Sequence, residues 1–307
     1  MTKATLDLTG QFYEGRAFDQ SKTDVEGLWL DGNNLSTLPD GLMTLARLKH
    51  LSCYDNQLKE LPEWLWTMKS LTHLNISANV IDVLSSHVEK LSNLEILDLQ
   101  HNQLSHLPPQ VGALLSLRFL YLAGNHFEDL PQNLSGLKKL LYLNISQNGF
   151  SRLPFCLSDL RALEELRCYR NQIKALGDEI AGLTALCELH GYDNQMAWIS
   201  PEIGKLSCLQ KLILDKNNLQ TLPQEMAGLK RLKVLSLRQN RLTSLPESLG
   251  FCTALEEIDL RENDLCTLPE SLRTLPNLAK LDVRLNKRLS LPSWFEELRR
   301  KGCRIYT

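Results

Sequence analysis

One pattern constrains this chain more than any other: the motif LxxLxLxxN recurs twelve times, with its asparagine every 23 residues. A second motif, xxLPxxLxxLxx, fills the space between the asparagines and carries proline in nine repeats. The other three repeats have Ser85, Gly177 or Ser200 at that position. A fixed period of this length is the signature of a solenoid, in which each repeat is one coil. The asparagines are Asn33, Asn56, Asn79, Asn102, Asn125, Asn148, Asn171, Asn194, Asn217, Asn240, Asn263 and Asn286.

The two halves of the repeat predict two kinds of local structure. In Leu97-Asp98-Leu99, alternation turns both leucines inward and Asp98 outward, which predicts one short strand in each repeat. The asparagine ends that strand, where its amide can bond backbone groups of its own turn and of the neighbouring coil. The LPxxLxxL half then returns the chain with apolar residues at helical or 3-10 spacing.

A single repeat cannot bury enough apolar surface to fold alone, so we expect one cooperative domain. Residues 25–292 form its twelve repeats. Residues 1–24 are expected to form an N-terminal cap, in which the degenerate half-repeat 6–11 adds one strand before the array. Residues 293–307 are expected to form a C-terminal cap, with a short helix carrying Trp294, Phe295 and Leu298 followed by an edge strand over 303–306.

These motifs resemble the leucine-rich-repeat superfamily, specifically the 23-residue class with LPxxLxxL found in intracellular Ras-pathway scaffolds, plant intracellular proteins and many bacterial proteins. The resemblance covers about residues 25–292. It implies an α/β solenoid shaped as a horseshoe, with a parallel β-sheet on the concave side and short helical or 3-10 segments on the convex side. It also implies a protein-interaction role. Bacterial members often append a ubiquitin-ligase domain, which we expect to be absent because only some 15 residues follow the last repeat.

Composition narrows the class of partner and the compartment. The net charge of −2 lacks the basic excess that attraction to nucleic acid or anionic membranes requires. No apolar stretch is long enough to cross a membrane or to serve as a secretion signal. The eight cysteines are scattered, as in reduced proteins. We therefore expect a cytoplasmic monomer, with export by a signal-less route left open.

No catalytic motif is present, and neither an enzymatic activity nor a cofactor is expected. Cys53 and Asp55 match the CxD of bacterial ubiquitin ligases, but Cys53 occupies an inward position and is read as core. Glycosylation sequons at Asn75 and Asn144 are read as chance, because a glycan there would obstruct the sheet. His50 and His73 share an outward column near Asp98, yet the pattern forces no third ligand, so we expect no metal.

Specificity must lie in the outward strand positions, the third, fifth and seventh of each repeat. Seven aromatic residues stand there within eight repeats, although aromatic residues make up only 7% of the chain. Aromatic residues and arginine are typical of interface hot spots, but propensity and cross-strand packing also favour aromatic residues in sheets. The predicted partner-binding residues of the first eight repeats are Trp29, His50, Tyr54, His73, Asp98, Phe119, Tyr121, Tyr142, Arg167, Tyr169, His190 and Tyr192.

Repeats nine to twelve carry charges on the same face. Arg238, Arg261 and Arg284 complete the predicted partner-binding set and stand beside Asp259 and Asp282. These charges either neutralise one another in solvated ion pairs or receive an acidic partner segment. In the eighth repeat, Gly191 replaces an inward residue. The missing side chain either leaves a small cavity, makes room for Cys168 or a side chain of a neighbouring strand, or lets the sheet bend locally.

The leading functional hypothesis is a rigid module or scaffold that binds a folded protein or an extended peptide on its concave face, such as a bacterial effector or immunity-type protein. The alternative is a binder of a small ligand or carbohydrate on the aromatic patch. A broad open face favours the first hypothesis and a closed pocket favours the second.

Overall fold

The structure, a computed structural model, describes residues 5–11 and 24–307. It falls into two compact units, one ending at Asn148 and the other running from Gly149 to Thr307. The predicted N-terminal cap is described only at 5–11 and at residue 24, and its remaining residues lie outside the described part. No helix of the described residues is both long and apolar enough to span a membrane.

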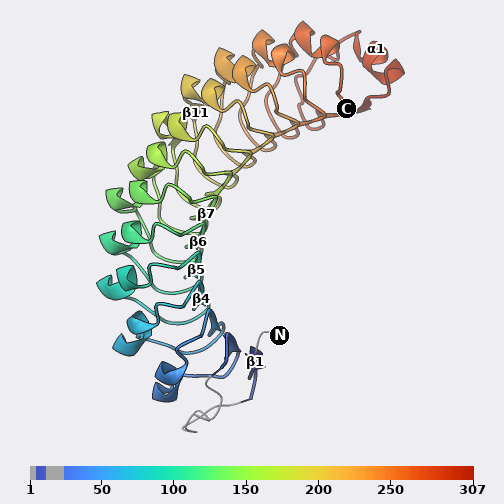
Figure 1. Cartoon of the computed structure of the whole chain (residues 1–307). Helices are drawn as coiled ribbons and strands as arrows, with labels where there is room; N and C mark the ends of the chain where they lie inside the picture. The colour runs from blue at the N-terminus through green and yellow to red at the C-terminus, as the bar shows by residue number, and fades with distance from the viewer. Residues whose placement is uncertain (1–4, 12–23) are drawn as a thin grey trace. The chain divides into compact units, whose positions relative to one another are not determined.

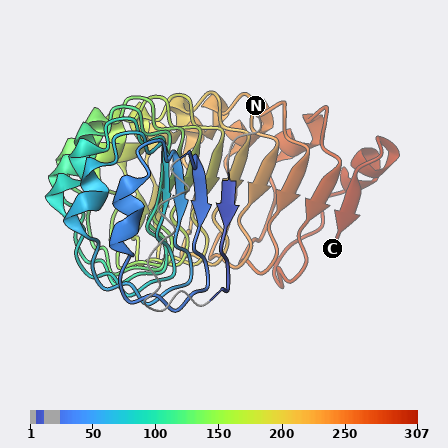
Figure 2. The ribbon, with the colours of Figure 1, turned by 60° about the horizontal axis from the view of Figure 1, so that its bottom comes forward.

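The strands of the main sheet in each unit are three residues long and parallel, and each pairs with the next main-sheet strand along the chain. Within the repeats, residues that pair between adjacent strands are one repeat apart in the sequence: Leu51 pairs with Leu74, and Leu212 with Leu235. In Figure 1 the strands of the first unit follow one another along one side of it, and Figure 2 shows the first of them side by side and pointing the same way. The first unit contains β1 (Thr5–Asp7), β2 (Gly27–Trp29), β3 (His50–Ser52), β4 (His73–Asn75), β5 (Ile96–Asp98), β6 (Phe119–Tyr121) and β7 (Tyr142–Asn144).

The second unit repeats this arrangement and adds a small second sheet. Its main strands are β8 (Glu165–Arg167), β10 (Glu188–His190), β12 (Lys211–Ile213), β13 (Val234–Ser236), β14 (Glu257–Asp259), β15 (Lys280–Asp282) and β16 (Arg304–Tyr306). The second sheet pairs β9 (Ala175–Leu176) with β11 (Trp198–Ile199). It forms in the two repeats whose usual proline is replaced by Gly177 and Ser200.

A five-residue 3-10 helix forms the returning half of each of the first eleven repeats, as the LPxxLxxL motif predicts. These helices lie on the side of the first unit away from its strands (Figure 1). In that unit they are η1 (Asp40–Thr44), η2 (Glu63–Thr67), η3 (Ser86–Lys90), η4 (Pro109–Ala113) and η5 (Gln132–Gly136). The second unit has η6 (Phe155–Asp159), η7 (Asp178–Gly182), η8 (Pro201–Lys205), η9 (Gln224–Gly228), η10 (Glu247–Phe251) and η11 (Glu270–Thr274).

The proline position of the repeat motif lies directly before each 3-10 helix, and the serines that replace proline in two repeats start the helix in another way. Proline stands there in most repeats with extended backbone. Where serine replaces it, the hydroxyl caps the helix instead: Ser85 Oγ accepts from the backbone of His87 at 3.3 Å, and Ser200 Oγ accepts from Glu202 at 3.1 Å. Both substitutions therefore retain a helix-starting residue, by a hydrogen bond rather than by a fixed φ.

The repeat asparagines form the predicted ladder inside each unit. Asn125 is typical: its Nδ2 donates to the carbonyl oxygens of Leu99 (2.9 Å) and Leu122 (3.1 Å), while its Oδ1 accepts from the backbone of Leu104 (3.0 Å). Each bond to the preceding repeat satisfies a buried backbone group that the strand leaves unpaired. The ladder therefore ties each coil to its neighbour as well as closing its own turn.

The C-terminal segment contains a short helix followed by a strand, in the order that the sequence predicts. The helix α1 (Phe295–Arg300) buries Phe295 and Leu298. Trp294 precedes the helix rather than lying on it. Strand β16 then pairs with β15 in parallel. At the other end, β1 overlaps the half-repeat and pairs with β2.

The inward leucines form the core of both units, and Gly191 does not leave a cavity in it. A Cβ at Gly191 would stand 3.0 Å from Leu214 Cδ2 and 3.1 Å from Met196 Cε. Leu214, which directly follows β12, and Met196 of the loop that follows Gly191 therefore occupy the missing volume. Cys53 is likewise core, with no exposed surface, and burial raises the pKa of its thiol well above the ordinary value. Cys53 thus lies in the core, as its inward position predicts.

Candidate partner-binding face

In each unit the third, fifth and seventh positions of the repeats form a surface, which we call the sheet face of that unit. Strand alternation turns these side chains away from the leucine core. Each of the fifteen predicted partner-binding residues lies on the sheet face of its own unit. Tyr54 and Arg284 are exposed and the other thirteen are half-buried. These residues therefore lie on the face that the sequence predicts. The contacts between their side chains, described below, could not be predicted from the sequence.

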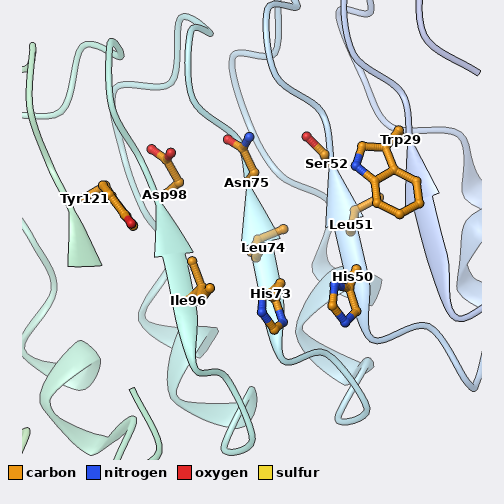
Figure 3. Close-up of a pocket in the computed structure, with 10 residues that line it drawn as sticks. All are labelled: Trp29, His50, Leu51, Ser52, His73, Leu74, Asn75, Ile96, Asp98 and Tyr121. Carbon is orange, nitrogen blue, oxygen red and sulfur yellow. The ribbon is translucent and has the colours of Figure 1, made fainter. Parts of the chain in front are cut away.

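In the first unit the sheet face is hollowed over strands β2 to β6. The hollow has a volume of about 290 Å³. Figure 3 shows its side chains in two rows: Ser52, Asn75 and Asp98 in one, and His50, His73 and Ile96 in the other. Trp29 and Tyr121 stand at opposite ends (Figure 3). All ten lining residues lie on strands, so the hollow is a trough in the sheet.

Trp29 closes its end of the trough because the residue two places earlier is glycine. A Cβ on Gly27 would stand 2.8 Å from Cη2 and 2.9 Å from Cζ3 of Trp29. The indole thus covers the third position of its own repeat, beside His50, which holds that position on the next strand. Gly27 was not among the predicted site residues, and its place at an outward strand position is the signal that could have found it.

His50 and His73 stack face to face, with ring centroids 4.1 Å apart and an interplanar angle of 9°. His73 Nδ1 also lies 2.8 Å from the hydroxyl of Thr72. The shared column predicts the proximity of the two imidazoles, and the structure adds their stacking. In this arrangement they form a flat side wall of the trough.

Asp98 lies near the Tyr121 end of the trough. Its Oδ1 accepts from the backbone of Gln100 at 3.0 Å, and the Gln100 amide donates to both carboxylate oxygens at 3.2 and 3.3 Å. The Asn144 side chain in turn donates through Nδ2 to the side-chain oxygen Oε1 of Gln100 at 3.3 Å, which fixes the orientation of the Gln100 amide. Burial raises the pKa of Asp98, although the hydrogen bonds from Gln100 and the nearby His101 act in the opposite direction.

Beside the trough, Phe119, Tyr121 and Tyr142 form a continuous aromatic cluster. The Tyr121 and Tyr142 rings are 4.8 Å apart and those of Phe119 and Tyr142 are 6.4 Å apart, both pairs tilted. Such geometry is favourable for aromatic pairs and holds the rings in place. The cluster and the trough share Tyr121, so they form one connected surface in the first unit.

The second unit begins with a different arrangement of predicted residues. Tyr169 and Tyr192 stack with centroids 4.4 Å apart and an interplanar angle of 7°. Arg167 Nε is 2.6 Å from Glu165, and His190 Nε2 is 2.9 Å from Glu188. Neither glutamate was in the predicted set, although both occupy third positions of their repeats.

Glu165, Glu188 and His190 form a cluster whose ligand atoms lie within 4.8 Å of one another. Such a set could in principle hold a metal ion. However, Arg167 binds Glu165, and Lys211 Nζ lies 3.6 Å from Glu188. These cations already balance the carboxylates, so the cluster is an ion-pair network in this structure.

The charged residues of repeats ten to twelve pair largely with one another. Arg261 binds Asp259 through Nε (2.9 and 3.0 Å) and Nη2 (2.5 Å), and Arg284 binds Asp282 at 2.9 and 2.6 Å. Arg238 Nη2 pairs with Glu262 Oε1 at 2.8 Å. Glu262 was not among the residues predicted for this face. Of the two expected readings of this region, the structure favours internal neutralisation.

Family models match most of the chain. A model described as a leucine-rich repeat region matches residues 81–192. A second, described as leucine rich repeat, matches residues 25–81, 207–265 and 231–287. No curated protein matches the chain.

Solved structures resemble the chain along most of its length. A leucine-rich-repeat protein of Leptospira interrogans is 34% identical, with a TM-score of 0.88, over 94% of this chain and 74% of that one. The plant peptide hormone receptor RGFR1, solved in complex with RGF2, is 26% identical with a TM-score of 0.79, over 99% of this chain and 49% of that one. The functional domain of InlJ from Listeria monocytogenes is 21% identical with a TM-score of 0.74, over 88% and 55%, and shows a shared fold. The chain thus spans about half the length of these last two proteins.

Proposed function

The chain belongs to the leucine-rich-repeat family, and from this premise we propose that it binds a protein partner, either a folded domain or an extended peptide, through its sheet face. The contact is centred on the first unit. The chain acts there as a rigid scaffold or effector module, and binding rather than catalysis is its role.

The observation that carries this proposal is the aromatic cluster of Phe119, Tyr121 and Tyr142 beside the trough. Rings held by tilted contacts present apolar area to a partner at little cost in side-chain entropy. A patch of this kind on the face of a sheet marks a docking surface more often than an ordinary solvated one. The plant peptide hormone receptor RGFR1, which was solved in complex with RGF2 and is similar to this chain, supports a polypeptide as partner.

The shape of the trough supports a polypeptide over an enclosed small molecule. Its volume of about 290 Å³ lies just below the range for pockets that hold drug-sized ligands, about 300 to 1,000 Å³. Its lining residues are all on strands, and none belongs to a loop that could close over a ligand. An open trough instead suits a segment of chain that continues past it at both ends.

The test is affinity capture from extract with wild-type protein and a Phe119→Ala/Tyr121→Ala/Tyr142→Ala variant, followed by mass spectrometry. The matched control is Leu115→Ala/Phe155→Ala/Phe251→Ala, which removes three exposed apolar side chains outside the sheet face. Circular dichroism and thermal unfolding verify that all three proteins are folded. A partner retained by wild type and control but lost from the first variant is the expected result. Equal retention by all three proteins would refute the assignment of the sheet face.

A further inference from the structure

Three repeats carry aspartate at the fifth position of the sheet face, and two of these aspartates have an internal counter-ion. Arg261 and Arg284, at the seventh position of their own repeats, bind Asp259 and Asp282. In the fourth repeat the seventh position is occupied by Gln100. Asp98 therefore receives neutral hydrogen bonds where its two counterparts receive a guanidinium.

Within the part of the chain that the structure describes, no lysine or arginine forms an ion pair with Asp98. Its neighbours are the Gln100 amide and, through charge alone, His101. A half-buried carboxylate without a cation carries a desolvation cost that an added cation would offset. Burial raises the pKa of Asp98, whereas Arg284 and Arg261 outweigh burial at Asp282 and hold the pKa of that group below its ordinary value.

The surroundings of Asp98 suit a cation more than an anion. The third, fifth and seventh positions of repeats one to six include Asp31 and Asp98 but no lysine or arginine. The trough also ends in the aromatic rings of Tyr121, on the strand beside Asp98, and of Trp29. Aromatic faces attract ammonium and guanidinium groups, and a planar guanidinium can stack on them.

The length of the trough suits an extended segment. Trp29 and Tyr121 lie on strands β2 and β6, four strand spacings apart, which is roughly 19 Å. An extended chain covers that distance with about six residues. One of these residues could place its side chain at Asp98 while the segment lies across the strands.

From this geometry we infer that the trough recognises a cationic side chain, arginine or lysine, of an extended partner segment, with Asp98 as its counter-ion and Tyr121 as an aromatic wall. The inference rests on the proposed function and adds the chemistry of the partner to it. The uncompensated carboxylate is then the specificity-determining group of the trough.

The experiment selects peptides from a displayed random dodecapeptide library against wild-type protein and three variants. Asp98→Asn removes the charge and keeps the shape. Gln100→Arg supplies the internal counter-ion found in repeats eleven and twelve. Asp259→Asn is the matched control, since it removes a carboxylate at the same repeat position in the second unit.

We expect wild type and Asp259→Asn to enrich peptides with arginine or lysine at one fixed position, and Asp98→Asn and Gln100→Arg to lose that preference. A synthetic peptide of the consensus should bind both variants about tenfold more weakly, as measured by calorimetry. Peptides that depend on Tyr121 and Tyr142 but show no cationic position, or keep it in Asp98→Asn, would overturn the inference while the proposed function stands. Failure to enrich any peptide that requires these tyrosines would count against both.

Discussion

The indole of Trp29 covers the α-carbon of Gly27, and a methyl group on Gly27 would stand 2.8 Å from the ring. Gly27→Ala is therefore expected to destabilise the protein by about 1 kcal/mol, because overpacking forces the indole out of its position. Urea denaturation measures the effect. The control is the same substitution in a Trp29→Ala background, where the clash is absent. An equal loss in both backgrounds would show that the contact with Trp29 is not the cause.

The asparagine ladder predicts a large effect from one buried amide. Asn125→Ala removes three donated bonds and one accepted bond. The carbonyls of Leu99 and Leu122 keep the amides of Asn102 and Asn148, but the buried backbone N–H of Leu104 loses its acceptor. We expect a loss of about 3 kcal/mol in the free energy of unfolding. Asn133→Ala, an exposed asparagine in η5, serves as control and should change the stability by less than about 0.5 kcal/mol. Similar losses for the two variants would contradict the ladder's role.

The residue before each repeat asparagine has left-handed backbone, usually without glycine. Ala78 is an example, with φ of 51°. Because a Cβ disfavours this conformation, Ala78→Gly is expected to stabilise the protein by about 0.5 kcal/mol, the reverse of the usual effect. Ala113→Gly, at the end of η4 and outside this conformation, should destabilise it. Thermal unfolding compares the two variants, and a loss of stability in Ala78→Gly would exclude relieved backbone strain.

Buried thiols predict a loss of stability at high pH. Burial raises the pKa of Cys168 to about 12 and that of Cys252 to about 11, whereas unfolded thiols ionise at about 8.5. The unfolded state therefore releases protons first, and the stability contributed below pH 8.5 is lost as the pH rises toward the folded values. Each thiol should lower the free energy of unfolding by about 1.4 kcal/mol per pH unit between pH 9 and 11.

Denaturant unfolding of wild type and Cys168→Ala/Cys252→Ala across this range isolates the effect from the titration of lysine and tyrosine. The double variant should show a shallower decline above pH 9. The exposed Cys266 provides the control, since Cys266→Ala should leave the wild-type slope unchanged. Parallel curves for wild type and the double variant would rule out the buried thiols as its source.

At Asp282 we expect the opposite pH dependence of stability, a loss at low pH. Burial acts to raise its pKa, but Arg284 and Arg261 outweigh burial and lower it. The stability it contributes is therefore present above the unfolded value, about 3.9, and is lost as the pH falls through the folded pKa. Asp282→Asn should cost about 1 kcal/mol at pH 7, because the exposed Arg284 loses its charged acceptor while Arg261 keeps Asp259, and less below pH 4. Asp264→Asn, at an exposed position, is the control and should show no such convergence in denaturant titrations.

Much of the architecture could be derived from the sequence because a 23-residue period leaves few alternatives. Alternation determines which residues of Leu97-Asp98-Leu99 face the core, and the buried asparagines have one role that satisfies their amides. The strand before the first repeat and the helix and strand after the last one follow from the same periodicity. The fifteen partner-binding residues reach the sheet face for this reason, whereas their contact with a partner stays a prediction.

Only the tertiary structure decided how the side chains on that face pair. The Trp29 indole covers Gly27, Arg238 selects Glu262, and Asp98 keeps a neutral partner. A repeat pattern states which column a residue occupies, but rotamers and cross-strand neighbours determine which atoms meet. The space at Gly191 was decided in the same way, by the reach of Leu214 and Met196. The sequence by itself thus determined the scaffold and which residues lie on its surface. Packing between coils determined the shape of the trough and which charged side chains find a partner. Local periodicity places a residue in a column of the sheet, but it carries no information on the direction in which the side chain points.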